Sequence, residues 1–242
     1  MCAGRIAFRI AFFRESLFSP SGMAYRRTEH VVRRLNARHD AIVDAARDAA
    51  ASGGMAAIQI APVAARAGVA AGTVYRYFPG KIELVGALVE SVAGREIEAV
   101  RRAADAAPGP LSALAAAIAT FGAHALRQRK LAWAVIAEPV DTDTDVVRQQ
   151  FRRDLAAEIE ARIRAAIEGG HLPEQDAQLA ARSLLGALLE GLIGPLAPEN
   201  IDAPLHSREA VRTLTLFALR GLGVVDARAR GLVVQTVLPE GE

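Results

Sequence analysis

Three interruptions by glycine or proline limit what residues 40–101 of this chain can fold into. They lie at Gly53-Gly54, at Gly68 and at Pro79-Gly80. Glycine tolerates the left-handed backbone conformation that ends many helices, and a proline disfavours a helical conformation in the residue before it. The stretch between the first and the last interruption therefore has room for two short helices only.

The apolar spacing around these interruptions predicts four helices. The first begins at Asp40 and carries an apolar stripe at three- and four-residue intervals up to the glycine pair. Two short helices follow, and a long helix begins near Lys81 and continues past Arg101. The short helices are expected at residues 60–67 and 71–78.

The rest of the chain has the same helical character. Apolar residues make up 52% of the chain and aromatic residues 5%, and alanine, a good helix former, dominates the apolar share. We therefore predict an all-α protein. Further helices are expected at residues 111–127, 131–137, 145–168, 173–193 and 207–222.

Cysteine content and hydropathy exclude several classes of protein. Cys2 is the only cysteine, so neither an intrachain disulfide nor a thiolate metal cage can form. Arginines interrupt the apolar residues near the N-terminus, which lack the apolar core of a signal peptide. The most apolar later stretch, residues 183–198, contains Glu190 and is too short to span a bilayer. We expect a cytoplasmic protein with no membrane partner.

Basic residues are concentrated in the N-terminal part. Residues 1–90 carry 12 Lys and Arg against 7 Asp and Glu, whereas residues 91–242 carry 17 against 20. Five arginines lie in residues 26–38, where apolar residues are few. This composition predicts a mobile basic arm ahead of the first packed helix.

Two features of the N-terminus each have two interpretations. Arg33, Arg34 and Arg38 either follow the minor groove or backbone of DNA or belong to a disordered solubilising tail. Residues 1–22 are either an amphipathic leader or sequence upstream of a true start at Met23, and we favour the second.

Small residues around the two short helices are typical of a helix-turn-helix. Two short helices that cross steeply need a small residue at the contact and a glycine at the turn, and Ala64 and Gly68 supply them. A helix turns by about 100° per residue, which places Ala71, Val74 and Phe78 on an inner face. The segment from Ile60 to Phe78 is therefore predicted to be one helix-turn-helix unit.

The opposite face of the second short helix suits the major groove of DNA. Gly72, Thr73, Arg76 and Tyr77 are expected on it. Gly72 and Thr73 are small enough to let the start of the helix come close to the bases. Arg76 can donate two hydrogen bonds to a guanine or to a phosphate.

Two tyrosines and a lysine near this face are candidates for phosphate contacts. The hydroxyls of Tyr75 and Tyr77 can donate to phosphate oxygens, and Lys81 lies at a helix start, where free amides favour a phosphate. Alternatively, both tyrosines pack beside Phe78. The outward direction expected for Tyr77 favours the DNA role.

Residues 63–84, VAARAGVAAGTVYRYFPGKIEL, resemble the DNA-binding signature of the TetR/AcrR family of regulators. The resemblance combines AGV at the turn, GTVYRYF on the second short helix, and a Lys followed by a Leu on the next helix. It implies a homodimer, an operator of two half-sites related by a dyad, and a C-terminal helical domain that binds a small inducer. The DNA contacts that it implies are Gln59, Thr73, Tyr75, Tyr77 and Lys81.

Two helix starts depart from the family pattern. Gln59 stands where the family usually has Thr or Ser before the first short helix, and Ala70 stands where it often has Ser before the second. Neither residue is a good N-cap, and losing a cap typically costs about 1 kcal/mol. We therefore expect tertiary packing to hold the start of the second short helix.

The predicted elements divide the chain into four parts. We expect a basic N-terminal extension at residues 1–37, a helix-turn-helix DNA-binding domain at 38–88, an effector-binding and dimerisation domain at 89–224, and a C-terminal tail at 225–242. The boundary between the two domains lies within the long helix that begins near Lys81.

Four residues of the predicted C-terminal domain could line an apolar effector pocket, although core packing is the commoner role of such residues. They are Phe121, His124, Trp133 and Phe151. Glu138 is either a polar group of that pocket or an exposed residue at a helix end before Pro139, and we favour the exposed end.

The last two predicted helices are apolar over more than one face, which suggests a homodimer interface with two helices from each subunit. The apolar residues available are Leu184, Leu185, Leu188, Leu189, Leu192, Leu214, Phe217 and Leu219. Alternatively, these helices cover the core of their own domain.

No catalytic pattern accompanies these features. The five histidines form no metal-ligand spacing, and no glycine-rich phosphate loop follows a strand. We expect no enzymatic activity, no cofactor and no metal. The sequence favours a repressor that binds a palindromic operator and is released by a small-molecule effector. The alternative is a DNA-binding activator or architectural protein without small-molecule control.

Overall fold

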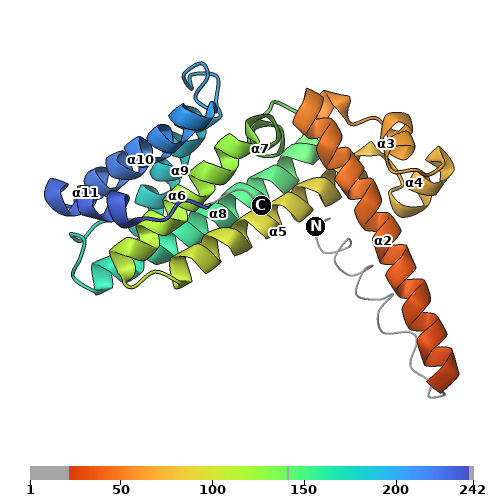
Figure 1. Ribbon diagram of the computed structural model, residues 1–242, viewed down its shortest axis with the longest axis horizontal. Helices are drawn as coiled ribbons and strands as arrows, with labels where there is room; N and C mark the ends of the chain where they lie inside the picture. The colour runs from red at the N-terminus through yellow and green to blue at the C-terminus, as the bar shows by residue number, and fades with distance from the viewer. Residues whose placement is uncertain (1–21, 141, 240–242) are drawn as a thin grey trace. The chain divides into compact units, whose positions relative to one another are not determined.

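A computed structural model of the chain describes residues 22–140 and 142–239. As predicted, these residues form helices joined by loops, with no strand among them (Figure 1). Two units are distinguished, one ending at Ala41 and one beginning at Ile42. No helix within the described ranges is long and apolar enough to cross a membrane.

The described helices follow one another in this order: α2 (Gly22–Gly53), the 3₁₀ turn η1 (Met55–Ala57), α3 (Ile60–Arg66), α4 (Ala71–Tyr77), α5 (Lys81–Asp105), α6 (Pro110–Arg127), α7 (Arg129–Ile136), α8 (Thr142–Glu168), α9 (Ala177–Leu192), α10 (Pro204–Gly221) and α11 (Asp226–Gln235).

Helix α2 begins earlier than the sequence predicted. It begins at Gly22 instead of Asp40, so the basic segment at residues 26–38 is helical. After its first turn α2 contains neither glycine nor proline until the pair that ends it, and its Arg, Ala and Leu residues favour a helix. The side chains from Val31 to Arg38 are all exposed. The two interpretations of the N-terminal leader concern residues outside those described, up to residue 21.

The two short helices α3 and α4 agree with the predicted ranges to within a residue at each end. They lie side by side (Figure 1). The core at this end of the second unit consists of apolar side chains from α2, η1 and its loop, α3, α4 and α5. Members that are each at most 4% exposed include Ile42, Val43, Ala46, Ile58, Val63, Val74, Leu84 and Leu88.

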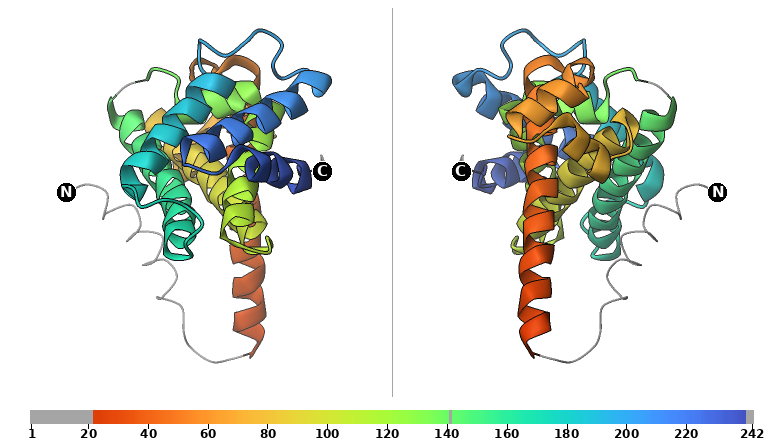
Figure 2. Two further views of the ribbon diagram at one scale, coloured as in Figure 1. Left: turned by 90° about the vertical axis from the view of Figure 1, so that its left-hand side faces the viewer. Right: turned by 90° about the vertical axis from the view of Figure 1, so that its right-hand side faces the viewer.

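Helix α6 is the central helix of the C-terminal part. It packs against α5, α7, α8, α9, α10 and α11, and Figure 2 shows α9, α10 and α11 together on one side of it. Small residues permit this close packing. A Cβ atom on Gly122 would lie 3.3 Å from the Leu192 side chain and 3.4 Å from that of Val211.

Helices α5 and α8 run side by side in the same direction. Arg101 Nη2 of α5 lies 3.1 Å from Glu158 Oε2 of α8, and Asp105 Oδ1 of α5 lies 2.8 Å from Arg162 Nη1 of α8. Both pairs are separated by 57 residues in sequence. Because the partner positions advance together along the two helices, the helices are parallel.

The C-terminal end differs from the prediction at three helices, of which α10 begins at Pro204, three residues before its predicted start. Helix α9 begins at Ala177, because the Asp176 side chain accepts hydrogen bonds from the amides of Gln178 and Leu179 at 3.0 Å and caps the helix there. Helix α11 lies where a tail was predicted at residues 225–242. It buries Ala229 and Val233, which lie one turn apart on the same face.

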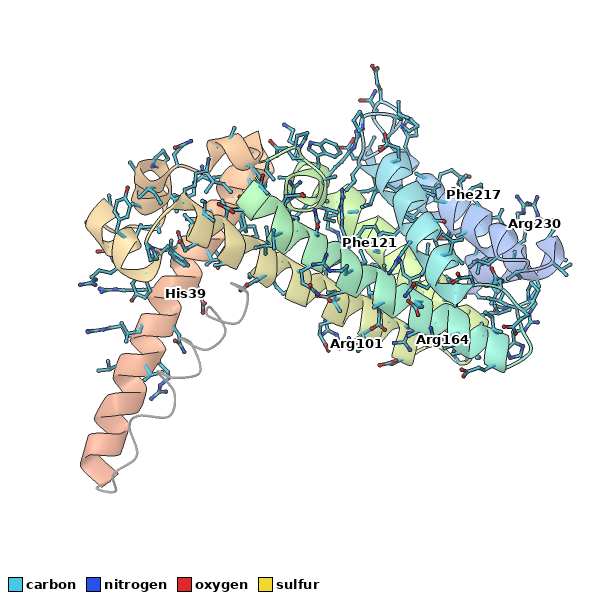
Figure 3. The ribbon with its side chains drawn as sticks, turned by 180° about the vertical axis from the view of Figure 1, so that it is seen from behind. His39, Arg101, Phe121, Arg164, Phe217 and Arg230 are labelled. Atoms are coloured by element: carbon cyan, nitrogen blue, oxygen red, sulfur yellow. The ribbon has the colours of Figure 1, made fainter. Side chains whose placement is uncertain are left out.

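Most leucines expected at a dimer interface lie in the core of their own chain. Those that are buried are Leu184, Leu185, Leu188, Leu192 and Leu219, while Leu189 and Leu214 are half-buried. Phe217 on α10 is 59% exposed, in contrast to Phe121 among the helices of the C-terminal part (Figure 3). The structure thus supports the core role for most of this set.

Candidate nucleic-acid interface

The turn between α3 and α4 is built by backbone hydrogen bonds around Gly68. The Gly68 amide donates to the Ala65 carbonyl at 3.2 Å, and the Val69 amide donates to the Ala64 carbonyl at 2.9 Å. This pair of bonds is the Schellman motif, which requires a left-handed residue after the helix. Gly68 supplies it with a φ of 67°. A Cβ atom on Gly68 would meet nothing within 4 Å, so conformation and not space requires the glycine.

The inner face of α4 holds it against the core. Val74 is fully buried, and Phe78, which follows the helix, is 4% exposed. Ala64 of α3 is 2% exposed, as expected for the small residue at the helix crossing. Ala71, predicted to lie on the same inner face, is exposed. It is the first residue of α4, at the edge of the contact, where the inner face no longer meets the core.

The outer face of α4 is open to solvent. Gly72 and Arg76 are exposed, Tyr75 is 54% exposed, and Thr73 is half-buried. A Cβ atom on Gly72 would meet nothing within 4 Å. Lys81 is exposed at the first turn of α5. Gly72, Thr73 and Arg76 thus lie on the outer face as predicted. Tyr75 and Lys81 are accessible next to that face.

Tyr77 does not face outward as predicted. It is half-buried, its ring centroid lies 6.5 Å from that of Phe78, and its hydroxyl oxygen is buried. The reason is its spacing, because Tyr77 lies three residues after Val74 and residues at that interval are neighbours on one side of a helix. The packing alternative therefore describes the position of Tyr77 better.

Neither short helix has a side-chain N-cap. Gln59 precedes α3, but its side-chain Nε2 donates to the Ala56 carbonyl at 3.1 Å and not to the helix. Ala70 precedes α4 and has no side chain that could cap it. The amide of Gln59 is exposed and free to turn toward a partner at the start of α3.

The surface around the short helices is electropositive. Between Asp48 and Glu83 the chain has no acidic residue, whereas it carries Arg66, Arg76 and Lys81. Arg66 lies 3.9 Å from Asp48, and both side chains are about half exposed. A surface of this charge favours a polyanion. In the first unit, Arg33, Arg34 and Arg38 are likewise exposed on α2.

The aromatic candidates for an effector pocket are divided between core and half-buried positions. Phe121 and Phe151 are each 2% exposed and lie in the core, whereas Trp133 is half-buried at its edge. Core packing, the commoner role, describes both phenylalanines. Trp133 is only partly covered by its neighbours.

His124 has a partner that the sequence analysis did not identify. Its Nδ1 lies 3.0 Å from Glu96 Oε2, and both side chains are largely buried between α6 and α5. The other carboxylate oxygen of Glu96 is buried and has no hydrogen-bond partner among the described residues. A signal existed, because the two residues lie at similar distances on either side of the turn at Gly109 and the helices it joins run antiparallel.

Glu138 is not the exposed residue that we favoured. It is half-buried, and its Oε2 accepts a hydrogen bond from the Met55 amide at 2.9 Å, across 83 residues of sequence. Its own carbonyl oxygen accepts a hydrogen bond from Arg148, a residue of α8 that is 2% exposed. The sequence carried no signal for either contact, since both depend on how the α7–α8 loop packs.

Within the described ranges, no three His, Cys, Asp or Glu side chains gather in a way that could hold a metal ion.

The two short helices α3 and α4 cross each other and have an electropositive outer face. The long helix α5 connects them to the helices of the C-terminal part. This arrangement defines a helix-turn-helix protein with a C-terminal helical domain. Residues 42–88 match the family of bacterial regulatory proteins known as the tetR family. The chain therefore carries a DNA-binding region of the TetR family at residues 42–88.

The chain is also similar to a repressor over part of its length. The HTH-type transcriptional repressor KstR of Mycolicibacterium smegmatis is 44% identical over 70 residues, which are 29% of this chain and 32% of KstR. The match thus spans about a third of the length of that relative.

Two solved structures share the fold over most of their length. The fatty acid degradation regulator FadR of Bacillus halodurans has a TM-score of 0.68 and 22% identity, covering 78% of this chain and 97% of that one. RolR in complex with resorcinol has a TM-score of 0.62 and 21% identity, covering 87% of this chain and 98% of that one. The likeness therefore extends beyond the helix-turn-helix to the C-terminal helices.

Proposed function

We propose that this protein is a transcriptional repressor that binds operator DNA as a homodimer and releases it when a small molecule binds. One observation carries the proposal: the outer face of α4 is exposed and free of acidic residues within the domain that matches the tetR family. The name of the relative KstR as a repressor supports the direction of regulation. The protein acts as a regulator, not an enzyme, in the cytoplasm, where operator DNA is accessible.

The recognition helix of the proposed complex is α4. Gly72 and Thr73 at its start allow close approach to the major groove, and Arg76 reads a guanine or holds a phosphate. Tyr75 and Lys81 donate to phosphates on either side. These four side chains and the glycine are accessible in the absence of DNA.

Gln59 and Tyr77 take different roles from these. The exposed amide of Gln59 can donate to a phosphate at the start of α3 if it leaves the Ala56 carbonyl. The buried hydroxyl of Tyr77 is not positioned for a phosphate, so we assign Tyr77 to holding α4 in place. A phosphate contact by Tyr77 would need its side chain to turn out of the core.

The proposed homodimer forms through α9 and α10. These helices leave Leu179 62% exposed and Phe217 59% exposed, while Leu189 and Leu214 are half-buried. Exposed apolar side chains on neighbouring helices suit a symmetric interface between two copies. Two copies would present two α4 helices to half-sites related by a dyad.

The effector is proposed to bind among the helices of the C-terminal domain, next to His124 and Glu96. The unpartnered carboxylate oxygen of Glu96 offers an acceptor there, and Trp133 offers a partly open ring. RolR was solved with resorcinol, a ligand that carries hydroxyl donors. A ligand that releases the operator must, by linkage, lose affinity by the same factor when the operator is bound.

The DNA-binding proposal is tested by genome-wide capture of bound DNA, followed by fluorescence anisotropy on a captured site. We expect Arg76→Ala to weaken operator binding, by about 1–3 kcal/mol if Arg76 reads a guanine. Arg228→Ala, which removes an exposed arginine of α11, is the matched control and should leave affinity unchanged. Equal affinities for the wild type and Arg76→Ala would contradict the assigned role of α4.

The effector proposal is tested by a thermal-shift screen of small molecules, with operator release as the second readout. A compound that stabilises the protein and also lowers operator affinity supports a ligand-released repressor. If stabilising compounds leave operator affinity unchanged, small-molecule control is excluded for those compounds, and an activator or architectural role becomes the better description.

A further inference from the structure

The contact between Glu138 and η1 joins two parts of the second unit that lie far apart in sequence. Glu138 belongs to the loop between α7 and α8, in the proposed effector-binding domain. Met55 begins η1, the turn that leads from α2 into α3. The Met55 amide donates to Glu138 Oε2 at 2.9 Å, and Met55 itself is 5% exposed. A hydrogen bond to an ionised acceptor in a partly buried place is among the stronger kinds.

The backbone around Met55 is shaped to receive this carboxylate. Gly54 has a φ of 70°, a conformation that side chains disfavour. A Cβ atom on Gly54 would lie 2.8 Å from Glu138 Oε2 and 3.0 Å from Oε1. The carboxylate thus occupies the space that a Cβ atom on residue 54 would need, so a side chain there would displace it from the Met55 amide.

Glu138 is itself held on the side of the C-terminal domain. Its amide donates to the Trp133 carbonyl at 2.8 Å at the end of α7. Its carbonyl accepts from the buried Arg148 of α8. The carboxylate thus extends from a point fixed to α7 and α8 at once.

Met55, which donates the hydrogen bond to Glu138, is close in sequence to the proposed DNA-binding helices. Ile58, three residues after Met55, is fully buried, and α3 begins at Ile60. The Ile58 amide donates to the Met55 carbonyl at 3.3 Å, so η1 and the start of α3 are linked through the backbone. A shift of the Met55 amide would move the start of the helix-turn-helix.

We propose that Glu138 is a positioning residue that fixes η1 and the start of α3 to the α7–α8 loop and so holds the helix-turn-helix in the arrangement that binds the operator. The inference rests on the proposed function and names a residue through which the C-terminal domain acts on it. In this proposal Glu138 affects operator binding through Met55 and not through a DNA contact of its own.

The direction in which operator affinity changes distinguishes a positioning role of Glu138 from a purely electrostatic effect of its charge. Removing a negative charge from a DNA-binding protein favours binding to a polyanion. Loss of the Glu138 carboxylate should instead weaken operator binding, because η1 is released. Glu174→Ala, which removes an exposed carboxylate in the loop before α9, is the matched control for charge.

The test compares full-length wild type, Glu138→Ala, Glu138→Gln and Glu174→Ala by anisotropy on a captured operator and by amide hydrogen exchange. We expect Glu138→Ala to weaken operator binding by about two- to thirty-fold, the range found for residues that couple two sites. Glu138→Gln keeps an oxygen that accepts from the Met55 amide and should recover most of the affinity. Amides at residues 55–57 should exchange faster in Glu138→Ala only.

Circular dichroism and thermal melting establish that each variant is folded at the assay temperature. If Glu138→Ala does not fold, Glu138→Gln carries the test, with Glu174→Gln added as its matched control. Glu138→Gln should then show a small loss of operator affinity that Glu174→Gln does not show. Operator affinity at or above the wild-type value in the folded Glu138 variants overturns this inference alone. Absence of operator binding by the wild type overturns the proposed function and this inference with it.

A reciprocal variant tests the same contact from the other side. Gly54→Ala places a Cβ atom against the carboxylate, so it should weaken operator binding in the wild type. The same substitution should cost less affinity in the Glu138→Ala background, where the clash is absent and only the backbone strain remains. Equal losses in the two backgrounds contradict the inference.

Discussion

The segment α3–α4 and the helices α5–α8 are stabilised in different ways. The two short helices have seven residues each, bury only Val63, Ala64 and Val74 among their own residues, and are closed by hydrogen bonds between near neighbours in sequence. The long helices share an extensive core and are joined by polar contacts between residues that lie 28 and 57 positions apart. The proposed DNA-binding surface thus lies on helices closed by local hydrogen bonds, whereas the helices that support it are joined by contacts between residues far apart in sequence.

This difference predicts that the two regions respond to substitution on different scales. A short element with few buried side chains opens at low free energy, whereas a region with a large core opens only with the whole domain. Changes in the core of α5–α8 should therefore lower global stability. Changes in α3–α4 should alter mainly local opening and DNA binding.

The largest effect is expected for Phe121→Ala. Phe121 is 2% exposed on the central helix α6, so its removal should lower the free energy of unfolding by about 3–5 kcal/mol. Urea denaturation followed by circular dichroism measures this loss. Tyr75→Ala, which removes an exposed aromatic residue of α4, is the control and should change stability by less than about 0.5 kcal/mol. Similar losses for the two variants would remove the distinction between the regions.

A smaller loss is expected for Glu158→Gln. Glu158 is 9% exposed on α8 and accepts hydrogen bonds from Arg101 and Arg162. Burial alone would lower the pKa of the Arg162 guanidinium, but the hydrogen bonds and charges of Glu158 and Asp105 outweigh burial and raise it. Gln removes the charge that these arginines face.

We expect Glu158→Gln to lower the free energy of unfolding by about 1–3 kcal/mol, less than a fully buried pair because Arg101 is half exposed. Glu160→Gln makes the same chemical change two residues further along α8. Glu160 pairs with Arg164, whose side chain is 58% exposed, so its loss should cost less than about 0.5 kcal/mol. A larger loss for Glu160→Gln in chemical denaturation would contradict the role given to the buried pair.

The sequence predicted features that depend on residues close together in the chain. It did not predict contacts between residues that lie far apart in the chain. The ranges of α3 and α4 follow from Gly68 and the proline-glycine break, which act within a few residues. The predicted direction of Tyr77 was wrong, because Val74 was placed on the inner face but Tyr77, three residues later, was not counted as its neighbour. The start of α2 was also wrong, because exposed residues without an apolar stripe were taken as irregular.

The contacts of Glu138 and the pairing of His124 with Glu96 depend on how whole helices meet. Glu138 reaches Met55 only because α7, α8 and the end of α2 converge, which no local pattern in the sequence encodes. Glu96 could have been proposed from the antiparallel arrangement of α5 and α6. Its unpartnered oxygen could not, since that depends on every side chain around it.

Two glycines of the helix-turn-helix should respond in opposite directions to the same substitution. Gly68 has a φ of 67°, so Gly68→Ala should destabilise the turn by about 1–2 kcal/mol through backbone strain alone. Gly72 lies within α4 and has open space around it, so Gly72→Ala should stabilise that helix by up to about 1 kcal/mol.

Hydrogen exchange of the α3 and α4 amides measures both changes. If Gly72 approaches the DNA, Gly72→Ala should also weaken operator binding although it stabilises the free protein. A Gly68→Ala variant whose α3 and α4 amides exchange as slowly as the wild type would contradict the requirement for a left-handed residue.

The smallest effect is expected for Ala70→Ser. Ala70 precedes α4 in an extended conformation but has no side-chain oxygen, so the first amides of the helix lack a cap. A serine there can accept from one of them and should stabilise α4 by about 0.5–1 kcal/mol. Ala71→Ser, one residue later inside the helix, cannot cap in this way and is the control.

The gain should be visible as slower exchange of the α4 amides, with the unfolding midpoint of the whole chain nearly unchanged. That result would follow if the short helix opens on its own, at a lower free energy than the core around Phe121. A gain that raises the global midpoint instead would mean that α4 unfolds only together with α5–α8. The segment α3–α4 and the helices α5–α8 would then unfold as one cooperative unit, and the difference in stability proposed between them would be wrong.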